Sequence, residues 1–283
     1  MYQPVRQSRS EFVQVRGLRY HVRIWDALDA RSTPCPPTDP GADTLVMLHG
    51  WMDVSASFQF LVDRLAPRWK VVAPDWRGYG LTDRPGADCY WFPDYLGDLD
   101  VLLEHYASSS AVKLVGHSMG GNVAMLYAGV RPHRVARLLN LEGLGMRFLS
   151  GEQAPERYAQ WMDQLREGAR MRDYASRDEV AQRLMKNNPR LTADKAQFLA
   201  LHWSAPADDG RFRILGDPAH KHVNPVLYRV EEVLACWQRI TAPLLWVDGD
   251  RTDVAKWWGH RYPRSEFDAR LALVPQVERC TLS

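Results

Sequence analysis

The sequence predicts an α/β fold, in which a mostly parallel sheet is flanked by helices and interrupted by one helical insertion. Two observations predict it. From about residue 44 to residue 142, short apolar runs of strand length alternate with helical segments. From about residue 145 to residue 236, amphipathic helical segments replace this alternation, and strand-like runs then return. We therefore expect a first core part at 1–145, the helical insertion at 146–236 and a second core part at 237–283.

The first expected element is a β-hairpin made by residues 11–15 and 18–25, because apolar and polar residues alternate on both sides of Arg16 and Gly17. Residues 33–41 contain four prolines and are expected to form a loop, since proline lacks a backbone donor. The remaining expected elements are strands at 44–48, 70–74, 111–115, 137–142, 243–249 and 277–282, and helices at 96–106, 122–128, 154–168, 177–187 and 192–203. Strand and helix thus alternate in the first core part, as a parallel sheet requires.

The pentapeptide from Gly116 to Gly120 has the pattern Gly-x-Ser-x-Gly and stands between an expected strand and an expected helix. This is the order of a nucleophile elbow, where a strained turn presents a serine hydroxyl at the top of a sheet. Glycines two residues before and after the serine let neighbouring backbone pass closely. The pattern nominates Ser118 as a nucleophile.

Two further motifs precede the elbow in the sequence. His49-Gly50-Trp51 follows the strand at 44–48, and an Asp-x-Arg-Gly-x-Gly loop begins at Asp75, after the strand at 70–74. With these motifs and the elbow, the chain resembles the α/β-hydrolase superfamily. The resemblance implies an α/β-hydrolase fold over nearly the whole chain, with the helical insertion at 146–236 as a cap that roofs the active site.

The resemblance also implies roles for individual residues. Ser118 corresponds to the nucleophile, and the backbone N–H groups of Trp51 and Met119 correspond to the two donors of the oxyanion hole. Such donors stabilise the negative oxygen of a tetrahedral intermediate. Four other residues are expected to brace the surrounding loops rather than to react, namely His49, His117, Asp75 and Arg77.

The catalytic acid has two candidate positions. Glu142 ends the strand after the elbow helix, where some members of the superfamily keep their acid, and we favour it. In other members the acid follows a late strand as Gly-x-x-Asp, but here the third residue after Gly249 is Thr252. Asp250 and Asp253 flank that position and are the alternatives.

The general base is not present at the expected place. In the superfamily the histidine follows the last strand, whereas this sequence ends at Ser283, directly after the strand at 277–282. We therefore expect a C-terminal truncation before the base, which would leave Ser118 a poor nucleophile at neutral pH. Five histidines follow Ser118 and are not expected to replace the base, namely His133, His202, His220, His222 and His260.

A serine nucleophile suits acyl transfer, whereas haloalkane dehalogenases and epoxide hydrolases of this superfamily use an aspartate. We expect a serine hydrolase that needs no cofactor and cleaves a small or medium carboxylic ester. Two alternatives stay open: a carbon–carbon bond hydrolase of the same fold, and a ligand-binding protein that has lost catalysis.

Composition limits the remaining possibilities. The formal net charge is +2 and the basic residues are scattered, so no nucleic-acid partner is expected. No apolar run reaches membrane-spanning length and no signal peptide is visible, which favours a cytoplasmic location. The four cysteines lack metal-ligand spacing, so no metal is expected: Cys35, Cys89, Cys236 and Cys280. The expected partner is a small ester-like substrate, and the oligomeric state is open.

Overall fold

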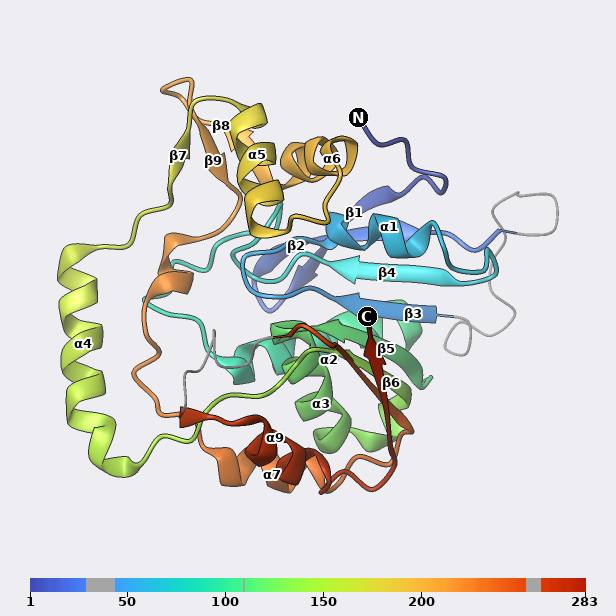
Figure 1. Ribbon diagram of the computed structural model, residues 1–283, viewed down its shortest axis with the longest axis vertical. Helices are drawn as coiled ribbons and strands as arrows, with labels where there is room; N and C mark the ends of the chain where they lie inside the picture. Colours follow the sequence, from blue (N-terminus) through green and yellow to red (C-terminus); the bar gives the residue numbers. More distant parts are fainter. Residues whose placement is uncertain (29–43, 109, 253–260) are drawn as a thin grey trace.

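The computed structural model describes residues 1–28, 44–108, 110–252 and 261–283, and an eight-stranded sheet forms its centre (Figure 1). The strands lie in the order β1-β2-β4-β3-β5-β6-β10-β11. Their bounds are β1 Arg9–Val15, β2 Leu18–Trp25, β3 Thr44–Leu48, β4 Lys70–Pro74, β5 Val112–His117, β6 Val135–Leu141, β10 Leu244–Gly249 and β11 Val277–Leu282. β1 and β2 pair as the expected hairpin and β2 is antiparallel to β4, while every pair from β4 to β11 is parallel. The prediction of a mostly parallel sheet is confirmed.

Helices cover both faces of this sheet. They are α1 Gln59–Val62, α2 Phe92–Ala107, α3 Met119–Val130, α7 Val230–Trp237 and α9 Arg264–Leu271, with the short 3-10 turns η1 Ser55–Phe58 and η2 Pro132–Arg134. Because strand side chains alternate between faces, Val46 and Leu48 join the core cluster that holds α2, α3, α7 and α9, whereas Leu45 and Met47 pack with Phe58 and Val62 on the other face. The carboxyl ends of the parallel strands therefore meet at one edge, where active sites of open α/β sheets form.

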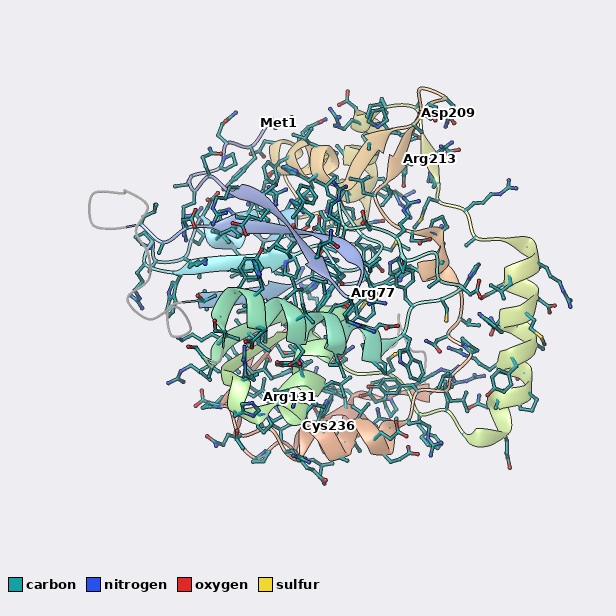
Figure 2. The ribbon with its side chains drawn as sticks, turned by 180° about the vertical axis from the view of Figure 1, so that it is seen from behind. Met1, Arg77, Arg131, Asp209, Arg213 and Cys236 are labelled. Carbon is teal, nitrogen blue, oxygen red and sulfur yellow. The ribbon has the colours of Figure 1, made fainter. Side chains whose placement is uncertain are left out.

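The insertion contains α4 Ala154–Glu167, α5 Arg177–Asn187 and α6 Ala193–Trp203, together with the 3-10 turns η3 Gly151–Gln153 and η4 Pro218–Lys221. The sequence led us to expect an insertion made of helices alone, and this prediction is wrong. The strands β7 Asp173–Tyr174, β8 Ser204–Pro206 and β9 Phe212–Ile214 form a small antiparallel sheet in the order β7-β9-β8. Arg213 supports it by ion pairs to Asp173 and Asp209 (Figure 2). Strands of two or three residues are too short to show alternation in a sequence.

The insertion at 146–236, called the cap below, packs on the core through the segment that follows β3. Val54 and Ala56 of that loop share an apolar cluster with Leu184 of α5 and Phe198 of α6. In contrast, α4 has no buried residue and stands at the side of the molecule in both views (Figures 1 and 2). Helix α7 packs with α3 in the main core. The expected boundaries of the insertion at 146–236 stay a prediction.

None of the helices in the described ranges is long and apolar enough to cross a membrane.

Candidate active site

Ser118 lies at the sharp junction between β5 and α3. Its φ is +51° and its ψ is −114°, a backbone conformation that a non-glycine residue adopts only when its surroundings impose it. The Ser118 N–H donates to the carbonyl oxygen of Leu141 at 2.8 Å, and the Ser118 carbonyl accepts from the N–H of Asn122 at 3.1 Å. The turn is thus held from β6 on one side and from the first turn of α3 on the other.

The glycines around Ser118 are required by close backbone approach. A β-carbon on Gly116 would lie 2.5 Å from the carbonyl oxygen of Gly120, and one on Gly120 would lie 2.5 Å from the carbonyl carbon of Leu48. Since an ordinary contact of this kind is 3.4 Å or longer, any side chain at either position would force backbone apart. This geometry explains the Gly-x-Ser-x-Gly spacing.

The loop after β3 passes directly over the elbow. A β-carbon on Gly50 would lie 3.2 Å from the Cβ of Ser118. The next residue is Trp51, one of the two expected oxyanion donors, and the other expected donor, Met119, is the first residue of α3. The first N–H groups of a helix lack intrahelical partners and are free to bind an anion.

His49 braces this loop, as expected. Its fully buried ring donates from Nδ1 to the carbonyl oxygen of Gly50 at 2.8 Å, and its Nε2 accepts from the N–H of Trp76 at 2.9 Å. Burial lowers the pKa of the His49 imidazole. Both ring nitrogens are therefore engaged with backbone, and His49 is neutral at physiological pH.

Asp75 and Arg77 hold the loop after β4. Burial alone would raise the pKa of Asp75, but hydrogen bonds from the His21 ring at 2.7 Å and the Ser55 N–H at 2.7 Å hold that pKa well below its usual range. Arg77 forms a two-pronged ion pair with the buried Asp98 of α2, with N···O distances of 2.5 and 2.7 Å (Figure 2). Both residues are engaged in structural contacts, in agreement with the sequence interpretation.

Glu142 follows β6 at the carboxyl edge of the sheet, with a φ of +57°. Its Oε1 accepts from the N–H of Gly249 at 3.0 Å and from the hydroxyl of Thr252. Among the described residues, Oε2 accepts no hydrogen bond. The carboxylate is therefore anchored through Oε1.

The alternative acids are placed differently. Asp250 is exposed, and its backbone N–H donates to the carbonyl oxygen of Leu282 at 2.8 Å. Asp253 lies outside the described residues. Sequence reasoning passed over Thr252 because it is not an acid, although its hydroxyl binds the favoured acid Glu142.

Within the described ranges, no histidine ring forms a hydrogen bond with Ser118. His220 is stacked between Tyr79 and Tyr90, at ring-centre distances of 3.7 and 3.5 Å, and burial lowers its pKa to about 3. His202 lies beside Arg23, and burial lowers its pKa to about 4.

Three other histidines of the described residues lie near the surface or bind backbone. His117 is 45% exposed, and its Nδ1 lies 4.0 Å from a carboxylate oxygen of Asp53. His222 donates from Nδ1 to the carbonyl oxygen of Asp88, and His133 is exposed on η2. His260 lies outside the described residues.

A cavity of about 260 Å³ opens beside the loop after β3, at Trp51 and Met52. Its opposite wall comes from the cap, mainly from α5 and the residues around β7. The indole Nε1 of Trp51 donates to the carbonyl oxygen of His220 at 3.2 Å, which links the loop to the cap. Two aromatic residues of the cap, Tyr174 and Trp203, line this cavity. In the described part of the chain, no cluster of three or more His, Cys, Asp or Glu side chains is arranged to hold a metal ion.

Comparison with known proteins agrees with this geometry. The family model described as the alpha/beta hydrolase fold matches residues 43–266. A serine hydrolase-like protein of Danio rerio is 32% identical over 143 residues, which are 50% of this chain and 40% of that protein. A serine hydrolase-like protein of Dictyostelium discoideum is 26% identical over 244 residues, which are 82% of this chain and 67% of that protein. The matches thus span 40% to 67% of the length of these two relatives.

A third curated relative is a 2-hydroxymuconate semialdehyde hydrolase of Pseudomonas sp. (strain CF600), which is 34% identical over 118 residues, or 39% of this chain and 40% of that protein. Among solved structures, a thioesterase domain from the curacin biosynthetic pathway superposes with a TM-score of 0.80 at 20% identity, covering 98% of this chain and 93% of that chain. At this identity the similarity shows the fold alone.

Proposed function

This chain belongs to the α/β-hydrolase-fold family, and from that membership and the geometry of its elbow we propose that it is a serine hydrolase of a small or medium carboxylic ester. The observation that carries the proposal is the backbone of Ser118, which is held at positive φ between β5 and α3 with Gly50 packed against its Cβ. A serine is held in such a strained turn where its hydroxyl must reach a substrate.

In the proposed reaction, the Ser118 Oγ attacks the ester carbonyl and loses its proton to a general base. The N–H groups of Trp51 and Met119 stabilise the resulting oxyanion. The alcohol leaves with a proton, and water then hydrolyses the acyl-enzyme on Ser118. Glu142 orients the base through Oε2. The identity of the base is open, since no histidine ring among the described residues forms a hydrogen bond with Ser118.

Fluorophosphonate labelling of the purified chain tests the proposal, with Ser118→Ala as control and peptide mass analysis to locate the label. Fast labelling confined to Ser118 supports an activated nucleophile and means that a histidine of this sequence serves as base. Absence of labelling above the control, from a chain shown to be folded by circular dichroism, would contradict the proposal and favour a ligand-binding protein.

A carbon–carbon bond hydrolase is the second candidate. It is favoured by the similarity to the 2-hydroxymuconate semialdehyde hydrolase over 118 residues. The same nucleophile and oxyanion donors would serve attack on a ketone carbonyl, from which a carbon group leaves with a proton in place of the alcohol. Product analysis with a β-diketone and with an ester of equal chain length distinguishes the two reactions. A cytoplasmic location stays a prediction from the sequence, which cell fractionation tests.

A further inference from the structure

The cavity beside the oxyanion loop is rich in positive charge. Three cationic side chains line it, Arg172, Arg183 and Lys221, and no carboxylate is among its described lining residues. They come from three separate parts of the cap, namely the segment before β7, helix α5 and the turn η4. Their convergence on one cavity of about 260 Å³ creates a positive potential that an anionic group would reduce.

These charges are only weakly neutralised within the described residues. The Arg172 guanidinium lies 3.7 Å from a carboxylate oxygen of Glu179, a distance too long for a strong hydrogen bond. Lys221 donates from Nζ to the carbonyl oxygen of Arg170 at 2.6 Å, a contact that leaves its charge without a counterion. Among the described residues, Arg183 forms neither a hydrogen bond nor an ion pair. Arg183 is therefore the cation most available to a ligand.

Helix α5 presents Arg183 to the cavity by its periodicity. Val180, Arg183, Leu184 and Asn187 all line the cavity, and their spacing of three and four residues places them on one helix face. Lys186 belongs to the same helix and does not line the cavity, and both Lys186 and Arg183 are exposed. The chain therefore offers a matched pair of cations on one helix, one inside the proposed site and one outside it.

The rest of the lining is mostly apolar. Met52 and Trp203 contribute to the wall together with Trp51, which directly follows Gly50 and its contact with the elbow. A ligand that fits this lining has an apolar part near the oxyanion loop and a charged end near the cap. Arginine binds planar anions such as a carboxylate through two parallel hydrogen bonds.

We infer that this cavity binds a carboxylate carried by the substrate, so that the ester cleaved at Ser118 belongs to a half-ester of a dicarboxylic acid or to a similar anionic acyl compound. The inference rests on the proposed function for the chemistry at Ser118. Recognition of the carboxylate itself involves no bond breaking, and it can be measured without turnover.

The test measures binding of two probes to the Ser118→Ala chain by isothermal titration calorimetry. The probes are monomethyl adipate, which carries one carboxylate, and dimethyl adipate, which is neutral. We expect monomethyl adipate to bind about tenfold more tightly, or ~1.4 kcal/mol, because the three cations are exposed and an exposed ion pair contributes about 0.2–1 kcal/mol each. The preference should shrink as the salt concentration rises from about 0.05 M to about 0.5 M.

The Arg183→Gln substitution should reduce this preference to about threefold or less, whereas Lys186→Gln should retain it. Arg172→Gln serves as a second variant within the cavity and should also reduce the preference. Equal binding of the two probes, binding of neither, or a preference that survives both arginine substitutions would overturn the inference. Failure of the proposed function is distinguishable, because it would abolish labelling of Ser118 while leaving probe binding unchanged.

Discussion

Replacing Gly120 by alanine is the sharpest test of how the elbow is built. The new β-carbon would lie 2.5 Å from the carbonyl carbon of Leu48 and 2.7 Å from the carbonyl oxygen of His49. The carbonyl oxygen of Leu48 would lie closer still. An ordinary contact begins at 3.4 Å, so backbone must move by more than about 0.9 Å, which is the difference between 3.4 and 2.5 Å. Both neighbours are backbone atoms of β3 and its loop, so no flexible side chain can absorb this displacement.

Two opposing contributions set the change in the free energy of unfolding of the Gly120→Ala chain. Alanine in place of glycine favours a helix by up to about 1 kcal/mol, and Gly120 lies within α3. Overpacking against rigid backbone costs about 3 kcal/mol, at the upper end of the usual range. We therefore expect a net destabilisation of roughly 2 kcal/mol, which corresponds to a fall in melting temperature of roughly 5 °C for a chain of this size. The same movement would displace the proposed oxyanion donors Trp51 and Met119 relative to Ser118, so labelling should slow by up to about 100-fold.

Thermal unfolding followed by circular dichroism and the rate of fluorophosphonate labelling are the two assays. Gly151→Ala is the matched control, because a β-carbon there meets nothing within 4 Å and the residue is not among those with positive φ. Its melting temperature should change little, by the equivalent of about 0.5 kcal/mol or less. If the Gly120→Ala chain has the same melting temperature and the same labelling rate as the wild type, the close-packing explanation of the Gly-x-Ser-x-Gly pattern is refuted.

Two further predictions concern titratable groups. Glu142→Gln keeps the shape of the side chain but removes its charge, so labelling of Ser118 should slow by roughly 10²–10⁴-fold. Asp250→Asn is the control and should leave the labelling rate within about twofold; the reverse pattern would reassign the acid. Burial lowers the pKa of His220 to about 3, whereas the unfolded chain takes up this proton near pH 6.5. The free energy of unfolding is therefore not reduced by His220 above about pH 6.5, and it decreases as the pH falls from there toward 3. The melting temperature of His220→Phe should depend less on pH over this interval than that of the exposed control His133→Phe, and equal slopes would show that His220 is not the responsible group.

The sequence predicted the elbow well because the whole signal is local. Ser118 and its two glycines belong to one strand, one turn and one helix, so the spacing of adjacent residues determines the backbone that the structure shows. The same reason applies to His49, whose hydrogen bond to Gly50 joins neighbouring residues. Glu142 could be nominated because it ends an apolar run, which marks the carboxyl edge of the sheet.

The sequence could not predict contacts that depend on distant segments. Thr252 binds Glu142 across 110 positions in the chain, so no spacing rule relates them. The small cap sheet was missed because its strands have two or three residues, fewer than a periodic pattern needs. The cavity cations were missed because Arg172, Arg183 and Lys221 lie on three different elements and each, taken alone, resembles an ordinary surface charge.

Trp51 connects the two parts of the proposed site. Its backbone belongs to the loop that passes over the Cβ of Ser118, whereas its indole, 50% exposed, donates to the His220 carbonyl of the cap and lines the cationic cavity. A ligand bound between Trp51 and α5 therefore contacts the oxyanion loop and the cap at once. Since the proposed oxyanion donors must be held within a fraction of an ångström to be effective, we reason that cap contacts influence both which substrate binds and how fast Ser118 reacts. Specificity and rate are thus expected to change together when this junction is altered.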